Sequence, residues 1–74
     1  MQQLRELRRM AGWTQARASR VSGINRAKVS QAECGEADLS DEEETRLRRV
    51  LLAAVRVRAS RIERVLSSVS ETAV

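Results

Sequence analysis

The sequence contains no histidine, proline, tyrosine or phenylalanine, and only one cysteine and one tryptophan. Without histidine and with a single cysteine, the chain has almost no means to build a zinc site or to perform histidine-based acid–base catalysis. We therefore expect no metal, no cofactor and no enzymatic activity. Cys34 cannot form an internal disulfide, which favours a reducing compartment.

Long hydrophobic runs are also missing. No stretch of 18 apolar residues occurs, and the N-terminal segment MQQLRELRRMAGW lacks the apolar core of a signal peptide. We expect a cytoplasmic location and no membrane partner. Ala, Leu, Arg and Glu are abundant, and 74 residues allow one small domain, so the composition predicts an all-α fold.

Positive charge is concentrated in the first half of the chain. Residues 1–37 hold seven basic and three acidic residues, whereas residues 38–74 hold seven of each. The whole net charge of +4 therefore lies in the first half. This asymmetry predicts a first half that faces a polyanion and a second half with another role.

Three glycines divide the first half into short helices. Gly12, Gly23 and Gly35 each follow a helical pattern, where a residue that accepts positive φ ends a helix at low cost. The pattern predicts helices over residues 2–11, 15–22 and 26–34, with Thr14 and Asn25 as the N-caps of the second and third. Because the turn between the last two is tight, they must diverge at a large angle, as in a helix-turn-helix.

The segment LSDEEETRL has the clearest helix start in the sequence. Ser40 and Glu43 have the spacing of a capping box, and the acidic residues of the first turn suit the helix dipole. After this segment the sequence contains no Gly or Pro that would interrupt a helix. A long fourth helix is therefore expected, and Leu47, Val50, Leu51 and Ala54 have the spacing of a face packed on the first three helices.

Farther along, a second apolar set is spaced alternately by three and four residues, as in a coiled-coil seam. Its members are Leu52, Val55, Ala59, Ile62, Leu66 and Val69. We expect a domain at residues 1–54 and a dimerisation extension with a frayed tail at residues 55–74. A parallel pair would bring Arg58 near Glu63 of a second copy, and an antiparallel pair would bring Arg56 there, so charge leaves the orientation open. The segment could instead fold back as a fifth helix.

The segment LRELRRMAGWTQARASRVSGINRAKVSQAECGE resembles the Cro/repressor-type (XRE-like) helix-turn-helix family. The resemblance rests on the ordered set GWTQ, SGINR and VSQAECG. It implies a third helix in the DNA major groove. By position it implies two groups of DNA contacts: base-reading residues Arg26, Ala27, Lys28 and Gln31, and phosphate-contacting or buttressing residues Gln15 and Asn25.

Side-chain chemistry agrees with these assignments. Arg26 can donate two hydrogen bonds to guanine, Gln31 suits adenine, and Ala27 offers a methyl contact to thymine. Ser30 is small enough to let the backbone approach DNA closely, and Arg17 and Arg20 are further phosphate candidates.

The resemblance also implies scaffold residues. Arg8 and Glu33 occupy the places of a salt bridge between the first and third helices, although Arg8 could contact phosphate instead. Trp13 could stack on a base, but its position before TQ favours packing. The expected core consists of Leu4, Leu7, Trp13, Ala18, Val21, Ile24, Val29 and Ala32.

Together these features predict a small dimeric DNA-binding transcription regulator, in the simplest case a repressor that occludes an inverted-repeat operator. The alternative is an antitoxin-like or adaptor protein. Its C-terminal helix would bind a partner protein, and its DNA binding would be autoregulatory only.

Overall fold

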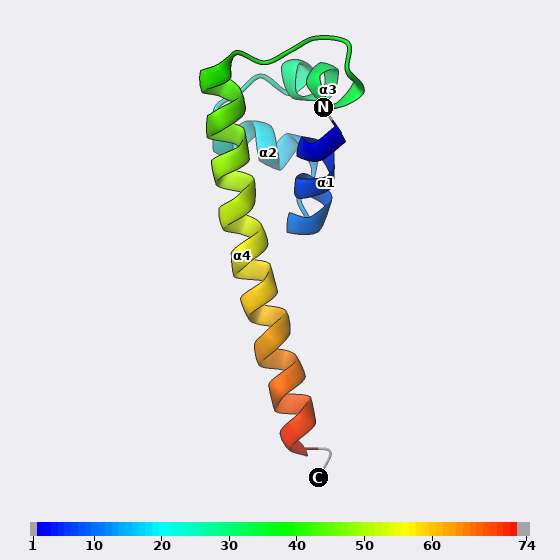
Figure 1. The fold of residues 1–74 in the computed structure, drawn as a ribbon, viewed down its shortest axis with the longest axis vertical. Helices are drawn as coiled ribbons and strands as arrows, with labels where there is room; N and C mark the ends of the chain where they lie inside the picture. Colours follow the sequence, from blue (N-terminus) through cyan, green and yellow to red (C-terminus); the bar gives the residue numbers. More distant parts are fainter. Residues whose placement is uncertain (1, 73–74) are drawn as a thin grey trace.

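The computed structural model describes the backbone of residues 2–72 and the side chains of residues 3–69. Over this range the chain forms four helices and no strand: α1 (Gln2–Ala11), α2 (Gln15–Ser22), α3 (Arg26–Cys34) and α4 (Asp41–Thr72). The first three helices gather at one end of α4, which continues alone and gives the molecule a length of 52 Å (Figure 1). The predicted all-α class, with three short helices and one long one, is confirmed.

Each short helix begins and ends as the sequence predicts. Thr14 Oγ1 accepts a hydrogen bond from the Arg17 backbone N–H at 3.1 Å, and Asn25 Oδ1 accepts one from the Ala27 N–H at 2.8 Å. Gly23 ends α2 in the left-handed conformation, with φ of 76°. Side-chain N-caps and a left-handed C-cap satisfy backbone groups that have no partner inside the helix.

Two serines hold the turn between α2 and α3. The buried Ser22 hydroxyl donates to the Ala18 carbonyl at 2.6 Å and accepts from the Ile24 N–H at 3.3 Å. Ser19 Oγ donates to the Ile24 carbonyl. Ile24 is itself buried, so its side chain and its backbone both fix the angle at which α3 leaves α2.

The start of α4 is a reciprocal capping box. The Ser40 N–H donates to Glu43 Oε1, and the Glu43 N–H donates to Ser40 Oγ, both at 3.1 Å. Lys28 Nζ, on α3, adds a 3.3 Å ion pair to Glu43 Oε2. The backbone hydrogen bond from Ser40 and the Lys28 ammonium lower the pKa of the Glu43 carboxyl.

The core lies where α1, α2 and α3 meet the first half of α4. Its buried apolar residues are Leu4, Ala18, Ile24, Val29, Ala32, Leu39, Leu47 and Leu51, with Leu7, Trp13 and Val50 packed at the edge. Most of the predicted core is confirmed, including the packing of Trp13. The prediction for Val21 is wrong: its side chain is 50% exposed, because it faces α4 across an open groove.

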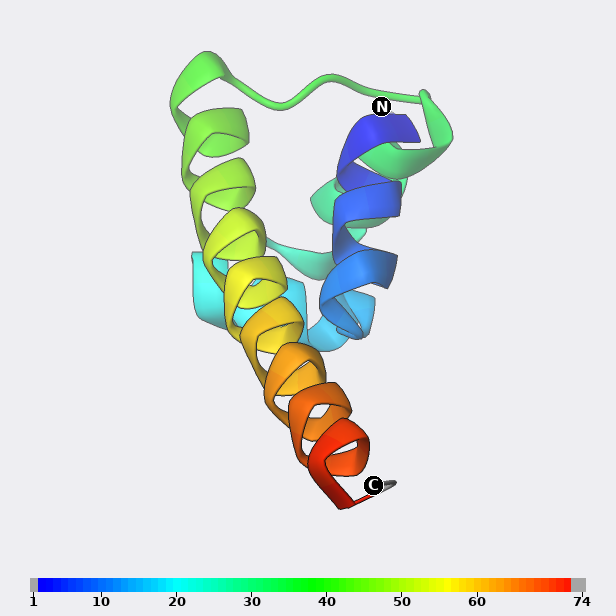
Figure 2. The same cartoon turned by 60° about the horizontal axis from the view of Figure 1, so that its bottom comes forward.

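Helix α4 is continuous to Thr72, so the alternative of a separate fifth helix is not what the structure has over residues 41–72. Both views show no other helix beside its distal part (Figures 1 and 2). None of the helices described is long and apolar enough to cross a membrane. The predicted frayed tail includes residues 73–74, which lie outside the described residues.

Candidate nucleic-acid interface

One side of α3 packs on the core, and its other side faces solvent. Val29 and Ala32 are buried, whereas Arg26, Ala27 and Gln31 are exposed. Ala27 and Gln31 are four residues apart and therefore lie one above the other on the exposed side. Ser30 is half-buried at the border. All four predicted base-reading residues are therefore exposed, and among residues 3–69 Arg26 forms no ion pair.

Lys28, the fourth predicted base-reading residue, has a different environment. Its ammonium is paired with Glu43 at the start of α4. The pair is exposed on the lysine side, and exposed ion pairs are weak because water screens the charges. Lys28 is therefore held toward α4 by a weak contact that a phosphate or a base could replace.

Arg8 and Glu33 form the ion pair that the sequence predicts between α1 and α3. Arg8 Nε lies 2.8 Å from Glu33 Oε2, and Arg8 Nη2 lies 2.9 Å from Glu33 Oε1. Arg8 Nη1 also donates to the Trp13 carbonyl at 2.9 Å. A bidentate pair fixes both distance and angle. Through these hydrogen bonds the Arg8 guanidinium links α1 to α3.

The Glu33 carboxylate is almost fully buried, with 3% of the side chain exposed. Burial acts to raise the pKa of this carboxyl, but hydrogen bonds from Arg8 and Gln15 and the positive charges of Arg8 and Arg5 outweigh it, so the pKa is lowered. The same contact raises the pKa of Arg8. Both groups are therefore charged at neutral pH, and each compensates for the burial of the other.

Gln15 and Arg17 point to opposite flanks of α2. Gln15 Nε2 donates to Glu33 Oε1 at 3.2 Å and so lies against α3. The Arg17 guanidinium lies 4.8 Å from the centre of the Trp13 ring, on the flank that faces α4. Arg20 is exposed, and Asn25 uses its side-chain oxygen to cap α3. The structure therefore brings Gln15 and Asn25 to α3 and places Arg17 away from them.

The first part of the predicted seam on α4 lies beside α1. Four of its members line hollows beside Met10 of α1: Leu52, Val55, Ala59 and Ile62. Val55 is half-buried, and the other five members are exposed: Leu52, Ala59, Ile62, Leu66 and Val69. Val65 is equally exposed and joins this stripe, although the strict seam spacing had left it out. Its position three residues after Ile62 was the available signal.

Arg58 marks the point where the two parts of α4 meet. Arg58 Nη1 donates to the carbonyls of Met10 and Arg9, at 3.2 and 3.5 Å, and so caps the C-terminal end of α1. A parallel bridge from Arg58 to Glu63 of a second copy would compete with these hydrogen bonds.

Comparisons of the chain with protein-family models, with curated proteins and with solved structures each return no match.

Proposed function

We propose that the protein is a sequence-specific DNA-binding transcription regulator that acts as a small repressor. The observation that carries this proposal is the exposed surface of α3, a helix that packs against α1 and α2. The Ser22 turn fixes one end of α3, and the buried Arg8–Glu33 pair fixes the other. A short helix supported in this way suits insertion into the major groove of DNA.

The exposed side chains of α3 supply suitable chemistry for reading bases. Arg26, in the first turn, can form two hydrogen bonds to guanine O6 and N7, and Gln31 can pair with adenine N6 and N7. Ala27 leaves room for the methyl group of thymine. Lys28 would exchange Glu43 for DNA, and Ser30 would allow close approach of the backbone.

Phosphate contacts would come from the rim of this surface. Arg20 is exposed, and the positions of Gln15 and Asn25 beside α3 suit contact with DNA or support of a base-reading side chain. Arg17 would first have to leave the Trp13 ring, so it contributes least among the predicted phosphate residues. The charge excess in residues 1–37 favours binding to any DNA sequence.

The exposed stripe on α4 would join two copies. Ile62, Val65, Leu66 and Val69 recur at three- and four-residue spacing on one side of a solvent-exposed helix. An apolar stripe of this kind is typical of an interaction surface. A homodimer in the cytoplasm would read an inverted repeat and repress by occluding a promoter.

A second candidate is an antitoxin-like or adaptor protein whose α4 binds a different protein. The observation in its favour is that α1 lies beside Leu52 and Val55, which shortens the surface left for a second copy. Sedimentation equilibrium at micromolar concentrations separates the two. A dimer that a Leu66→Glu substitution converts to a monomer favours the regulator, and a monomer in both cases favours the adaptor.

DNA binding itself is tested by fluorescence anisotropy with a labelled pool of random duplexes. The expected loss of affinity between 50 and 200 mM salt is about 10³-fold or more for a dimer that contacts at least six phosphates. Arg26→Ala should weaken binding, whereas Arg64→Ala, which removes the same charge from the distal part of α4, should not. Equal losses in the two variants would place the interface elsewhere.

A further inference from the structure

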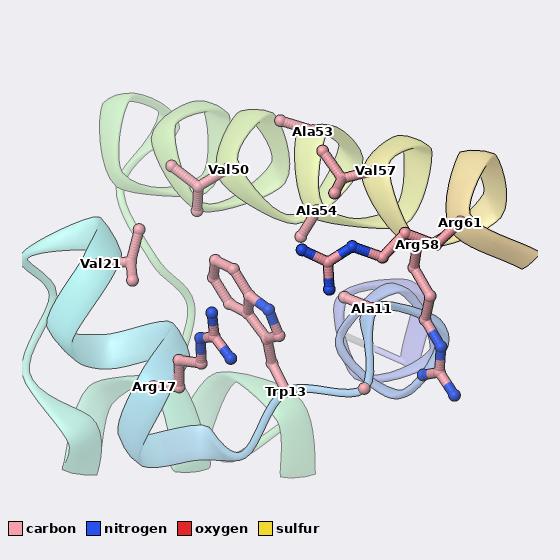
Figure 3. Close-up of a pocket in the computed structure, with 11 residues that line it drawn as sticks. Ala11, Trp13, Arg17, Val21, Val50, Ala53, Ala54, Val57, Arg58 and Arg61 are labelled. Carbon is pink, nitrogen blue, oxygen red and sulfur yellow. The ribbon is translucent and has the colours of Figure 1, made fainter.

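A groove runs between α2 and α4, on the flank of α2 that faces away from Gln15. Its volume is about 640 Å³. Figure 3 shows the Trp13 ring inside it, between the two helices, with side chains from both helices around it. The residues that give the groove its chemistry are Trp13, Arg17, Val21, Val57, Arg58 and Arg61.

The floor and walls of the groove are apolar, and they are only partly covered. Val21 and Val57 are 50% and 54% exposed, from opposite sides of the groove. Trp13 and Val50 are half-buried between them. The sequence predicts Val21 as core, and the structure leaves it beside an open space of the size that small-molecule sites have.

Charge in the groove is of one sign. Arg17, Arg58 and Arg61 line it, and no acidic residue does. Among residues 3–69 none of the three arginines forms an ion pair with a carboxylate. Arg17 lies over the Trp13 ring, and Arg58 bonds to two backbone carbonyls. Three uncompensated guanidinium groups beside apolar walls favour a ligand with a negative end and an apolar body.

We propose that this groove binds a small amphipathic organic anion: an apolar chain or ring of about 10 carbon atoms ending in one carboxylate, sulfonate or phosphate group. The apolar body lies against Trp13, Val21 and Val57, and the anionic group accepts hydrogen bonds from Arg17 and Arg61. The residues of α3 proposed to read bases do not line the groove, and Arg17 is the one groove residue that is also a predicted phosphate contact. Loss of base reading would therefore leave the groove proposal standing, and loss of anion binding would leave the base-reading proposal standing.

Trp13 is the single tryptophan of the chain, so its fluorescence reports on the groove directly. The full chain is titrated with decanoate below its micelle-forming concentration, and with decyltrimethylammonium, which has the same tail and the opposite charge. Decanoate should change the emission of Trp13 saturably, and the cation should bind at least about tenfold more weakly. Far-UV circular dichroism of the same samples should stay constant.

Two matched variants locate the site. Val57→Glu places a carboxylate in the groove, and Ser67→Glu places one on an exposed position of the distal α4 that belongs neither to the groove nor to the apolar stripe. Decanoate binding should fall about tenfold or more in the first and stay unchanged in the second. The proposal is overturned by equal binding of both probes, by equal loss in both variants, or by a fluorescence change that accompanies loss of helix.

Discussion

The two halves of α4 have similar apolar spacing and opposite surroundings. In the first half Leu51 is fully buried, whereas in the second half Leu66 is 62% exposed. The difference comes from α1 and α2, which pack on the first half, while residues 59–69 are exposed (Figures 1 and 2). A periodic apolar stripe therefore predicts a helix and its apolar face, but it does not predict what covers that face.

The largest expected effect is the difference in stability between variants at Leu51 and Leu66. Leu51→Ala removes a fully buried side chain and should lower the free energy of unfolding by about 2–5 kcal/mol. Leu66→Ala should change it by less than about 0.5 kcal/mol at submicromolar concentration, which disfavours pairing of two copies. Urea denaturation followed by circular dichroism measures both. A comparable loss in the two variants would mean that the distal stripe is covered within one chain.

The same comparison between buried and exposed positions can be made with two charged residues, Glu33 and Glu63. Glu33→Ala leaves Arg8 without its buried partner and should cost about 3 kcal/mol. Glu63→Ala, on the distal α4, removes an exposed carboxylate and should cost less than about 0.5 kcal/mol. Thermal unfolding of both variants and of the unmodified chain at pH 7 gives the two differences, and similar values would show that the Arg8–Glu33 pair does not tie α1 to α3.

The stability that the Arg8–Glu33 ion pair contributes should also depend on pH. Because the pKa of the Glu33 carboxyl is lower in the folded chain than in the unfolded chain, the contribution of the Arg8–Glu33 pair to stability is fully present above the unfolded-state pKa. It is lost as the pH falls through the lower folded-state pKa. The difference in stability between the unmodified chain and Glu33→Ala should therefore narrow on acidification below the ordinary glutamate pKa, and a difference that stays constant would contradict this assignment.

A smaller effect is expected where the two halves of α4 meet. Gly12 has a φ of 74°, and a side chain there would collide with the Arg58 guanidinium that caps α1. Gly23 has nearly the same φ and open space around it. Gly12→Ala should cost about 2 kcal/mol and Gly23→Ala about 1 kcal/mol, since only the first adds loss of the Arg58 hydrogen bonds to α1 to the backbone strain. Equal costs in thermal unfolding would show that Arg58 does not hold α1.

The local signals in the sequence predicted the helices well, because caps and glycines act within a few residues. The same is true of the Ser40–Glu43 capping box. The Arg8–Glu33 pair, which joins residues far apart in the chain, came from the family resemblance and is present. What local spacing could not give were the relations between helices: the groove that exposes Val21, the contact of α1 with the seam at Val55, and the stacking of Arg17 on Trp13.

The first measurement to make is a selection experiment for the proposed reading of DNA by α3. Duplexes are selected from a random pool with the full chain, and those that bind are sequenced. We expect the selected duplexes to contain an inverted repeat whose half-sites are about one helical turn apart. We also expect Gln31→Ala to change one position in each half-site. Enrichment of no sequence at all, with the chain folded, would contradict the proposal that α3 reads DNA bases.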